Sequence, residues 1–280
     1  MPDSSPVCKF QPYDGFVIIL SFTSARGPVG MRIAPGCCVF VMKSGRFLVA
    51  QSLLMVLFLS PSALFAETDV LQGWGFFLGG AHVPPGLSNG ISAVACGSDF
   101  SLALRADGTV VGWGNNDVGQ ASPPAGLSGV VAIAAGIHQH ALALKSDGTV
   151  VAWGNNNHGE STVPAGLQGV IAIDANGGSG GQGYSIALRA NGSVVAWGHN
   201  EYGQCNVPAG LSDAVAVAAG DYFCAAARSN GTVVVWGLSD SARTVRPVPD
   251  SATNVIALSA YDHILALRAD GTVVAWGRND

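Results

Sequence analysis

Charged residues are scarce in this chain, at 11% of 280 positions, and basic residues are scarcer than acidic ones. From Glu67 onward there are 16 acidic and 8 basic residues. A groove for nucleic acid needs many Lys and Arg side chains to contact phosphates, so we expect no nucleic-acid partner. Hydrophobic residues make up 49% of the sequence, which excludes the composition of a disordered chain.

Cysteines are few after Glu67 and have no regular spacing: they are Cys96, Cys205 and Cys224. An odd number without short spacings is neither a disulfide framework nor a zinc site. Cys96 and Cys224 stand where other repeats have alanine, so we interpret both as small buried residues. A disulfide from Cys205 to another chain is the open alternative.

No apolar run at the N-terminus is long enough to span a membrane. The run at 47–59 has 13 residues, whereas a span needs about 20. Basic residues precede it and small residues follow it, which is typical of a secretory signal peptide over 42–66, cut after Ala66. We therefore predict a secreted or periplasmic protein, with cell-surface association open and no membrane span in the mature chain.

The predicted signal peptide divides the chain into three segments. Residues 1–41 match nothing that follows, and we interpret them as an upstream extension to a chain whose translation starts at Met42. Residues 42–66 are the signal peptide, and 67–280 form the folded domain.

Glycine is abundant, at 38 residues without a collagen-like period, which indicates many tight turns. Each tryptophan is followed by glycine, and successive tryptophans lie 39, 40, 44, 39 and 40 residues apart. A fixed period of this length is typical of a propeller or a solenoid. The repeated tryptophans, which we expect to be structural and buried, are Trp74, Trp113, Trp153, Trp197, Trp236 and Trp276.

One repeat, from Val130 to Leu167, predicts the structure of the others. Residues 130–136, 140–144 and 149–153 are apolar and β-branched, as in strands. Asp147-Gly148 lies between two of these runs and predicts a type I′ hairpin turn, with positive φ at both residues. The segment 161–164 is a weaker fourth strand, followed by a turn at 165–167.

The expected fold class is all-β, a β-propeller of about five four-stranded blades. The strands are apolar on both sides, so both faces of each sheet must be covered, as in blades stacked around an axis. A β-solenoid is the alternative, but its coils are usually shorter and lack an internal hairpin.

The segment Ala143 to Leu167 reads A-L-K-S-D-G-T-V-V-A-W-G-N-N-N-H-G-E-S-T-V-P-A-G-L and strongly resembles the repeat of the regulator of chromosome condensation family. The D-G turn, the W-G strand end and the A-A-G step recur in register over about residues 70 to 280. The resemblance implies a propeller of four-stranded blades, commonly seven, that binds other proteins.

Members of that family differ in function. The nuclear founder is an exchange factor for a small GTPase, whereas a secreted bacterial member with similarly short repeats inhibits β-lactamase. The predicted export excludes a nuclear GTPase as partner, and the short period is similar to the bacterial inhibitor, so we interpret the chain as bacterial. The sequence ends within a loop, which fits a fragment of a seven-bladed ring better than a five-bladed ring closed by the strand of Trp74.

Strand parity predicts which loops share a face. The loops after A-A-G and after W-G lie at one end, called the top face here, and the D-G and A-G-L turns lie at the other. The top loops vary in length, with an insertion at 177–183 and a replaced loop at 238–249, and repeat proteins place such variation on the binding side. The predicted partner contacts are aromatic, acidic or histidine side chains of these loops: Phe100, Asp117, His138, His158, Tyr184, Glu201, Tyr202, Asp221, Tyr222, Tyr261 and Asp262.

Asn116, Asn156, Asn200 and Asn279 share one register in the loops after W-G, and we interpret them as turn residues. We predict no metal and no cofactor, because His138 and His140 have no further convergent ligands and the 177–183 insertion lacks the Lys of a phosphate loop. No nucleophile motif or carboxylate pair stands out from the repeat, so we expect no enzyme. The predicted function is protein interaction, perhaps-free alternatives being inhibition of an extracytoplasmic protein within that class and carbohydrate binding outside it.

Overall fold

The computed structural model describes residues 90–137, 139–178, 182–237 and 247–277, positions 83, 84 and 87, and the backbone of 38–43, 46–50 and 70–74. In these residues the secondary structure is β-strand and turn, without a helix. They also contain no helix long and apolar enough to cross a membrane. The chain is therefore all-β over the part that the structure describes.

The strands form three-stranded antiparallel sheets, and each sheet takes consecutive strands from one repeat. The repeat chosen from the sequence forms β7 (Val130–Gly136), β8 (His140–Lys145) and β9 (Val150–Gly154), which confirms its first three predicted strands. The remaining repeats give β4 (Ile91–Cys96), β5 (Phe100–Arg105), β6 (Val110–Gly114), β10 (Val170–Gly178), β11 (Gln182–Arg189), β12 (Val194–Gly198), β13 (Ala214–Ala219), β14 (Phe223–Arg228), β15 (Val233–Gly237), β16 (Val255–Ala260), β17 (His263–Arg268) and β18 (Val273–Gly277).

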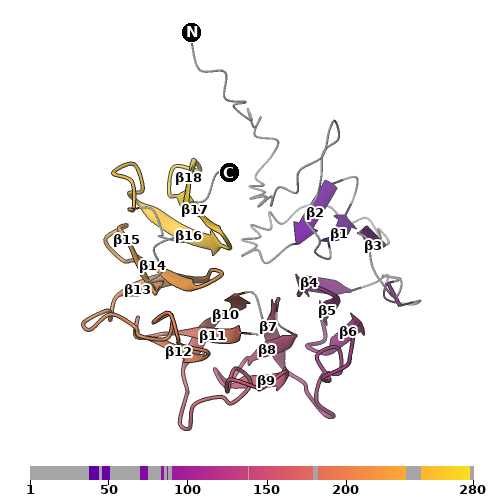
Figure 1. Cartoon of the computed structure of the whole chain (residues 1–280). Coiled ribbons are helices and arrows are strands. Elements are labelled where there is room, and N and C mark those ends of the chain that lie inside the picture. The colour runs from indigo at the N-terminus through magenta and orange to yellow at the C-terminus, as the bar shows by residue number, and fades with distance from the viewer. Residues whose placement is uncertain are drawn as a thin grey trace, which may run out of the picture.

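A further sheet has the order β2-β1-β3, from β1 (Cys38–Lys43), β2 (Arg46–Ala50) and β3 (Val70–Trp74). β2 lies inside the predicted signal peptide, and cleavage after Ala66 would remove both β1 and β2. Figure 1 shows the sheets following one another around a centre. The first strand of the β4–β6, β7–β9 and β16–β18 sheets lies nearest that centre, and the third lies at the outside, as in the blades of a propeller.

The predicted fourth strand is not part of any described sheet. Residues 161–164 have no strand assignment, and they run from a turn at 157–161 to a turn at 165–166. Pro164 has no backbone N–H to donate to a ladder, and proline occupies the same place in the neighbouring repeats as Pro124 and Pro208. Each described blade therefore has three hydrogen-bonded strands and an extended connection to the next blade.

The hydrophobic core lies between the sheets, because large side chains of one blade face small ones of the next. Phe100, Leu102 and Leu104 of β5 cluster with alanines of β8. Leu142 and Leu144, which alternate with those alanines, face the following blade instead. This arrangement confirms the prediction that both faces of each sheet are covered, and it makes each blade depend on its neighbours.

The tryptophans complete the core between blades, as predicted. Trp113, Trp153, Trp197 and Trp236 are buried, with exposed fractions of 7–8%. The indole Nε1–H of Trp153, Trp197 and Trp236 donates to a backbone carbonyl of the preceding blade, at 2.9 to 3.0 Å. Each of these tryptophans therefore ties its blade to the one before it.

The hairpin turns differ from the predicted type I′ geometry. Gly148 has a φ of +77°, but Asp147 is not among the described non-glycine residues with positive φ. The Gly148 N–H donates to the Lys145 carbonyl at 2.9 Å, and the Lys145 N–H donates to the Thr149 carbonyl, as in a three-residue type I loop with a left-handed glycine. Asp147 Oδ1 accepts hydrogen bonds from the N–H and hydroxyl of Thr149, and these bonds lower the pKa of Asp147 to about 2.

The three cysteines after Glu67 are free thiols in the described part of the chain, and Cys96 and Cys224 are buried. This placement agrees with their interpretation as small core residues. Burial raises the pKa of Cys205, which is partly exposed, to about 12. At neutral pH this thiol is therefore protonated and a weak nucleophile.

Candidate functional site at the top face

The two kinds of predicted top loop meet in the structure. The N–H of Asn115, in the loop after β6, donates to the Asp99 carbonyl in the loop before β5, at 2.8 Å. The same bond joins Asn155 to Gln139 at 2.8 Å and His199 to Gly183 at 2.9 Å. The predicted top face is therefore a real surface, formed by two loops of each blade.

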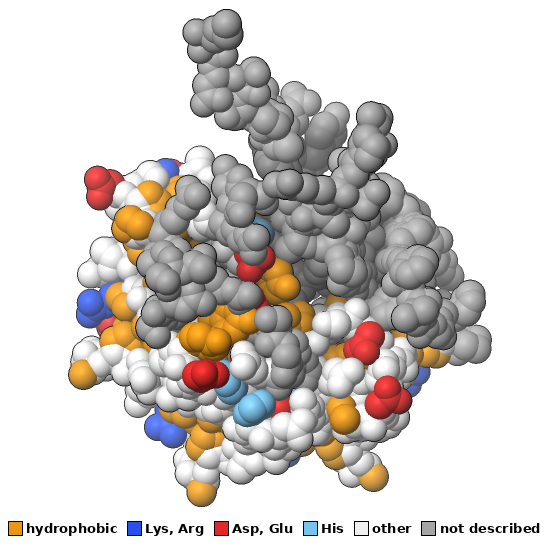
Figure 2. Space-filling model, viewed as in Figure 1, with side chains coloured by type: hydrophobic (Ala, Val, Ile, Leu, Met, Phe, Trp, Pro, Cys, Tyr) orange, Lys and Arg blue, Asp and Glu red, His pale blue; other side chains and the backbone are white. Residues whose placement is uncertain are grey.

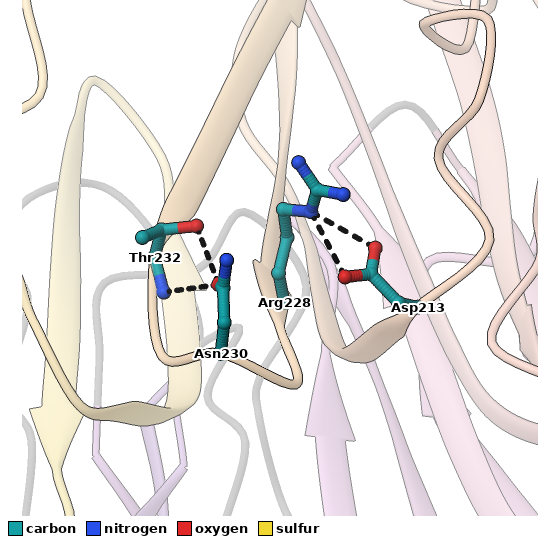
Figure 3. Close-up of polar contacts among 4 residues, drawn as sticks. All are labelled: Asp213, Arg228, Asn230 and Thr232. Atoms are coloured by element: carbon teal, nitrogen blue, oxygen red, sulfur yellow. Dashed lines mark hydrogen bonds and ion pairs between the residues drawn. The ribbon is translucent and has the colours of Figure 1, made fainter.

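The opposite end of each blade is fixed by a bond between neighbouring blades. The N–H of the first residue of the next blade donates to the carbonyl of the hairpin glycine, as in Val130 to Gly108 at 3.1 Å and Ala214 to Gly192 at 3.0 Å. Asn230 replaces the turn aspartate in blade β13–β15 and makes the same bonds to Thr232, and Arg228 Nε contacts both Asp213 carboxylate oxygens at 2.9 and 3.1 Å (Figure 3). Because these bonds depend on spacing, they explain why this turn keeps a constant length.

Asparagines in one register hold the top loops after W-G, as predicted for turn residues. The Oδ1 atoms of Asn116, Asn156 and Asn200 each accept the N–H of the residue five positions later, at 2.8 to 3.0 Å. Their Nδ2 atoms donate to the side chain six positions later. These asparagines are therefore part of the loop frame.

A second frame residue is buried beneath each loop. Gln120, Glu160 and Gln204 have no exposed surface, and each side chain accepts the N–H of the residue two positions before it. The Gln120 amide also donates to Asn115 Oδ1 at 2.5 Å. Glu160 replaces this amide by a carboxylate, and its Oε1 is buried without a hydrogen-bond partner.

We predict that Glu160→Gln stabilises the protein by about 1–2 kcal/mol, because the substitution removes a buried, unpaired carboxylate oxygen and keeps the acceptor for His158 N–H. The midpoint of urea unfolding at neutral pH measures the change. The matched control is Gln204→Glu, which should lower the midpoint by a similar amount. A lower midpoint for Glu160→Gln would show that the carboxylate has a stabilising contact.

The structure divides the predicted contact residues into three groups. Asp117, His158 and Glu201 are exposed, and Tyr202, Asp221, Tyr261 and Asp262 are partly exposed. Phe100 and Tyr184 have no exposed surface and Tyr222 has 3%, so the surface role predicted for these three is contradicted by their burial between blades. His138 lies outside the described residues.

Burial of Phe100 and Tyr184 has a common cause, because each begins the second strand of its blade and fills the space between blades. His140 and Phe223 hold the same position, which is opposite the glycine that ends the third strand. The glycine of the A-A-G step leaves room for this side chain: a Cβ on Gly97 or Gly136 would overlap Phe100 or His140 of the same blade. The sequence pattern therefore marked a packing position as a surface position.

Four aromatic side chains form a continuous row over three consecutive blades. His158 contacts His199 edge-to-face with ring centroids 4.8 Å apart, His199 lies 6.0 Å from Tyr202, and Tyr202 contacts Tyr222 at 4.7 Å. His199 and Tyr222 are buried, and they hold the more exposed His158 and Tyr202 from below. We call His158, His199, Tyr202 and Tyr222 the aromatic row.

The hydrogen bonds of His199 fix its tautomer. The Gln204 amide places Oε1 on the Tyr202 N–H, so its Nε2–H₂ donates to His199 Nδ1 at 3.0 Å. Nδ1 is then the acceptor, and the proton on Nε2 points to the Glu201 carboxylate, 3.5 Å away. Burial and the nearby His158 lower the pKa of His199, while Glu201 raises it, so the row is neutral at physiological pH.

Sequence reasoning missed a polar connection beside the row. Asp174 and Asn176 replace the first alanine and the glycine of A-A-G, and both bind Ala219 of the next blade: Asp174 Oδ2 accepts its N–H at 2.9 Å, and Asn176 Nδ2 donates to its carbonyl at 2.8 Å. The Tyr184 hydroxyl donates to the Gly220 and Phe223 carbonyls at 2.7 and 2.5 Å. These bonds hold the start of the loop that carries Tyr222, and the D-A-N spelling was the available signal.

We predict that stability rises as the pH falls from 7 towards 4, through Asp174. Burial raises the pKa of Asp174 from 3.8 to about 6, so between these values the folded chain binds a proton that the unfolded chain has released. The gain is up to about 3 kcal/mol, at about 1.4 kcal/mol per pKa unit. Urea unfolding of the wild type and of Asp174→Asn across this range isolates the effect, and parallel curves would contradict it.

The described residues hold no cluster of three His, Cys, Asp or Glu side chains that could bind a metal ion. His140 Nε2 lies 3.2 Å from Ser185 Oγ, and the hydroxyl donates to the Glu160 carbonyl at 2.9 Å. His140, Ser185 and Glu160 are all fully buried. This contact connects two blades, and the arrangement offers a substrate no access.

The repeats match a known sequence family in register with the sheets. The profile described as the regulator of chromosome condensation (RCC1) repeat matches residues 91–120, 130–160, 170–204, 214–242 and 256–280, more than half of the chain. The chain belongs to this repeat family. No curated protein sequence matches it.

Solved RCC1-like structures share the fold. The ectodomain of the Physcomitrella patens receptor kinase CR4 is 26% identical with a TM-score of 0.52, over 65% of this chain and 50% of that one. Prp20p from Saccharomyces cerevisiae, described with its binding to Gsp1p and histones, is 20% identical with a TM-score of 0.52, over 70% and 58%. This RCC1-repeat chain thus spans between half and three fifths of their lengths.

Proposed function

We propose that this RCC1-repeat protein is an exported, non-catalytic interaction module that binds a protein through its top face. The observation that carries the proposal is the division of labour in the loops after W-G. Asparagine and buried Gln or Glu side chains fix the loop backbone, while the positions that vary between repeats, such as Asp117, His158 and Glu201, are exposed. A constant frame with variable exposed side chains is typical of repeat proteins that bind other proteins.

The composition of the face supports a protein ligand. Protein interfaces are enriched in tyrosine, and binding energy concentrates where an aromatic side chain is supported by packed neighbours. Tyr202 meets this description, because Tyr222 and His199 support it from two sides. The family also includes a protein, Prp20p, that is described as binding Gsp1p and histones.

Capture by the top face tests the proposal. The mature chain, immobilised as wild type and as the His158→Ala/Tyr202→Ala variant, is exposed to periplasmic and culture fractions. The control variant is Val215→Ala, which changes an exposed apolar residue of β13 away from the row. We expect a protein that is retained by the wild type and the control but lost from the double variant. Retention on a glycan array with no retained protein would favour carbohydrate binding instead.

Export is a separate part of the proposal. It is supported by the basic, apolar and small-residue segments of 42–66. Expression of the full chain with a C-terminal tag, followed by fractionation and N-terminal sequencing, should give an exported protein that begins at Glu67. A cytoplasmic protein that retains residues 42–66 would refute export and leave the binding face unaffected.

A further inference from the structure

The charges of the described blades are sorted between their two ends. From residue 90 onward, each described Lys or Arg ends the second strand of its blade, beside the hairpin turn; these residues are Arg105, Lys145, Arg189, Arg228 and Arg268. The turn end also has acids that pair with these cations, as in Lys145–Asp147 at 3.2 Å, Arg228–Asp213 at 2.9 Å and Arg268–Asp270 at 3.2 Å. The turn end is therefore close to neutral.

The top face has carboxylates without described cations. Its acidic side chains are Asp99, Asp117, Glu201, Asp221 and Asp262, all exposed or partly exposed. Arg243, Arg246 and Arg278 belong to top loops but lie outside the described residues. The surface around the aromatic row is thus acidic over the part that the structure describes.

Three of these acids border the aromatic row. Glu201 lies between His199 and Tyr202 in the chain, and its side chain is 66% exposed. Asp221 precedes Tyr222, and its N–H donates to the Tyr261 carbonyl at 3.1 Å, which brings the Asp262 loop beside it. We call Glu201, Asp221 and Asp262 the acidic border.

The space-filling view agrees with this sorting. Figure 2 looks onto the top face, since the described histidines belong to the top ends of the blades and pale-blue side chains are visible. Orange and pale-blue groups lie together near its middle, with red groups beside them, while the blue Lys and Arg groups lie at its outline. An apolar, aromatic centre is therefore bordered by negative charge.

We infer that the segment of the partner that docks on the aromatic row carries Arg or Lys side chains. This inference rests on the proposed function, and it names the chemistry of the partner. A guanidinium or ammonium group over a tyrosine ring is attracted to the ring face, and a carboxylate beside the ring adds a charge-assisted hydrogen bond. An acidic segment would meet repulsion at the same place, which gives the face its selectivity.

Short synthetic peptides test the inference on the mature chain. One template is made with its charged positions all Arg, all Gln or all Glu, and binding is measured by fluorescence anisotropy. The Arg peptide should bind at least about tenfold more tightly than the Gln peptide, and its affinity should fall as NaCl rises from about 50 to 300 mM, because salt screens exposed charges. The Glu peptide should not bind. Absence of binding by the Arg peptide, or equal binding of the Glu peptide, overturns the inference.

Two matched variants locate the interaction. Glu201→Gln/Asp221→Asn/Asp262→Asn neutralises the acidic border, and Asp107→Asn/Asp147→Asn/Asp270→Asn removes the same charge from the turn end. Asn191 and Asn230 already occupy that turn position, so the control variant should fold. Only the border variant should weaken the Arg peptide by about tenfold or more. An equal loss in both variants means diffuse attraction and overturns the inference.

The protein captured by the top face separates this inference from the proposed function. A captured protein that loses affinity in His158→Ala/Tyr202→Ala but not in the acidic-border variant leaves the proposed function standing and overturns the inference. If affinity persists in the aromatic variant as well, both ideas fail.

Discussion

Trp197→Ala should destabilise the protein by about 3–5 kcal/mol, the usual cost of removing a buried tryptophan. The side chain is 7% exposed and lies in a cluster with residues of the preceding blade, such as Leu142 and Leu144. Its Nε1–H donates to the Glu160 carbonyl at 2.9 Å. The substitution therefore leaves a cavity between two blades and a buried carbonyl without its donor. Equilibrium urea unfolding at neutral pH measures the change.

Two further variants separate packing from hydrogen bonding. Trp197→Phe keeps an aromatic ring and removes the donor, so most of the expected loss should remain absent, with about 1–2 kcal/mol lost. Trp276 is partly exposed and its Nε1 has no described partner, so Trp276→Ala should cost less than Trp197→Ala. Equal costs for Trp197→Ala and Trp276→Ala would contradict the role of the indole as a connection between blades.

The strands could be predicted because their signals are periodic and repeated. The W-G step and the apolar runs fixed the three strands of each blade to within a residue or two, since each copy supports the same register. The hairpin turn type could not be predicted from Asp-Gly alone. Type I′ and a type I turn with a left-handed glycine both place glycine there, and the Asp147–Thr149 side-chain bonds go with the second.

The top face could be predicted as a surface but not residue by residue. Strand parity places Phe100 and Tyr222 at the same end as Tyr202, yet it does not say whether a side chain points outwards or between blades. A large residue that opens the second strand fills the gap left by the glycine of A-A-G, which is visible only once two blades are packed. The aromatic row was also hidden from the sequence, because its members come from three loops that only the blade order brings together.

The backbone of the loop that carries Glu201 and Tyr202 depends on one glycine. Gly198 ends β12 with a φ of +106°, and a Cβ there would lie 2.8 Å from the Gly183 carbonyl oxygen and 2.8 Å from Tyr184 Cα. Both neighbours are backbone atoms of the adjacent strand, which cannot rotate away as a side chain would. Strain in the left-handed region costs about 1–2 kcal/mol and overpacking about 1–3 more.

Gly198→Ala should therefore destabilise the protein by about 2–5 kcal/mol in urea unfolding. The matched control is Gly166→Ala, whose φ of +75° carries similar backbone strain but whose Cβ would have no neighbour within 4 Å. The control should lose only about 1–2 kcal/mol, so the difference between the two variants measures the contact itself. If both cost the same, the close approach of β12 to β11 does not hold the loop, and the position of Tyr202 must depend on the Asn200 and Gln204 bonds alone.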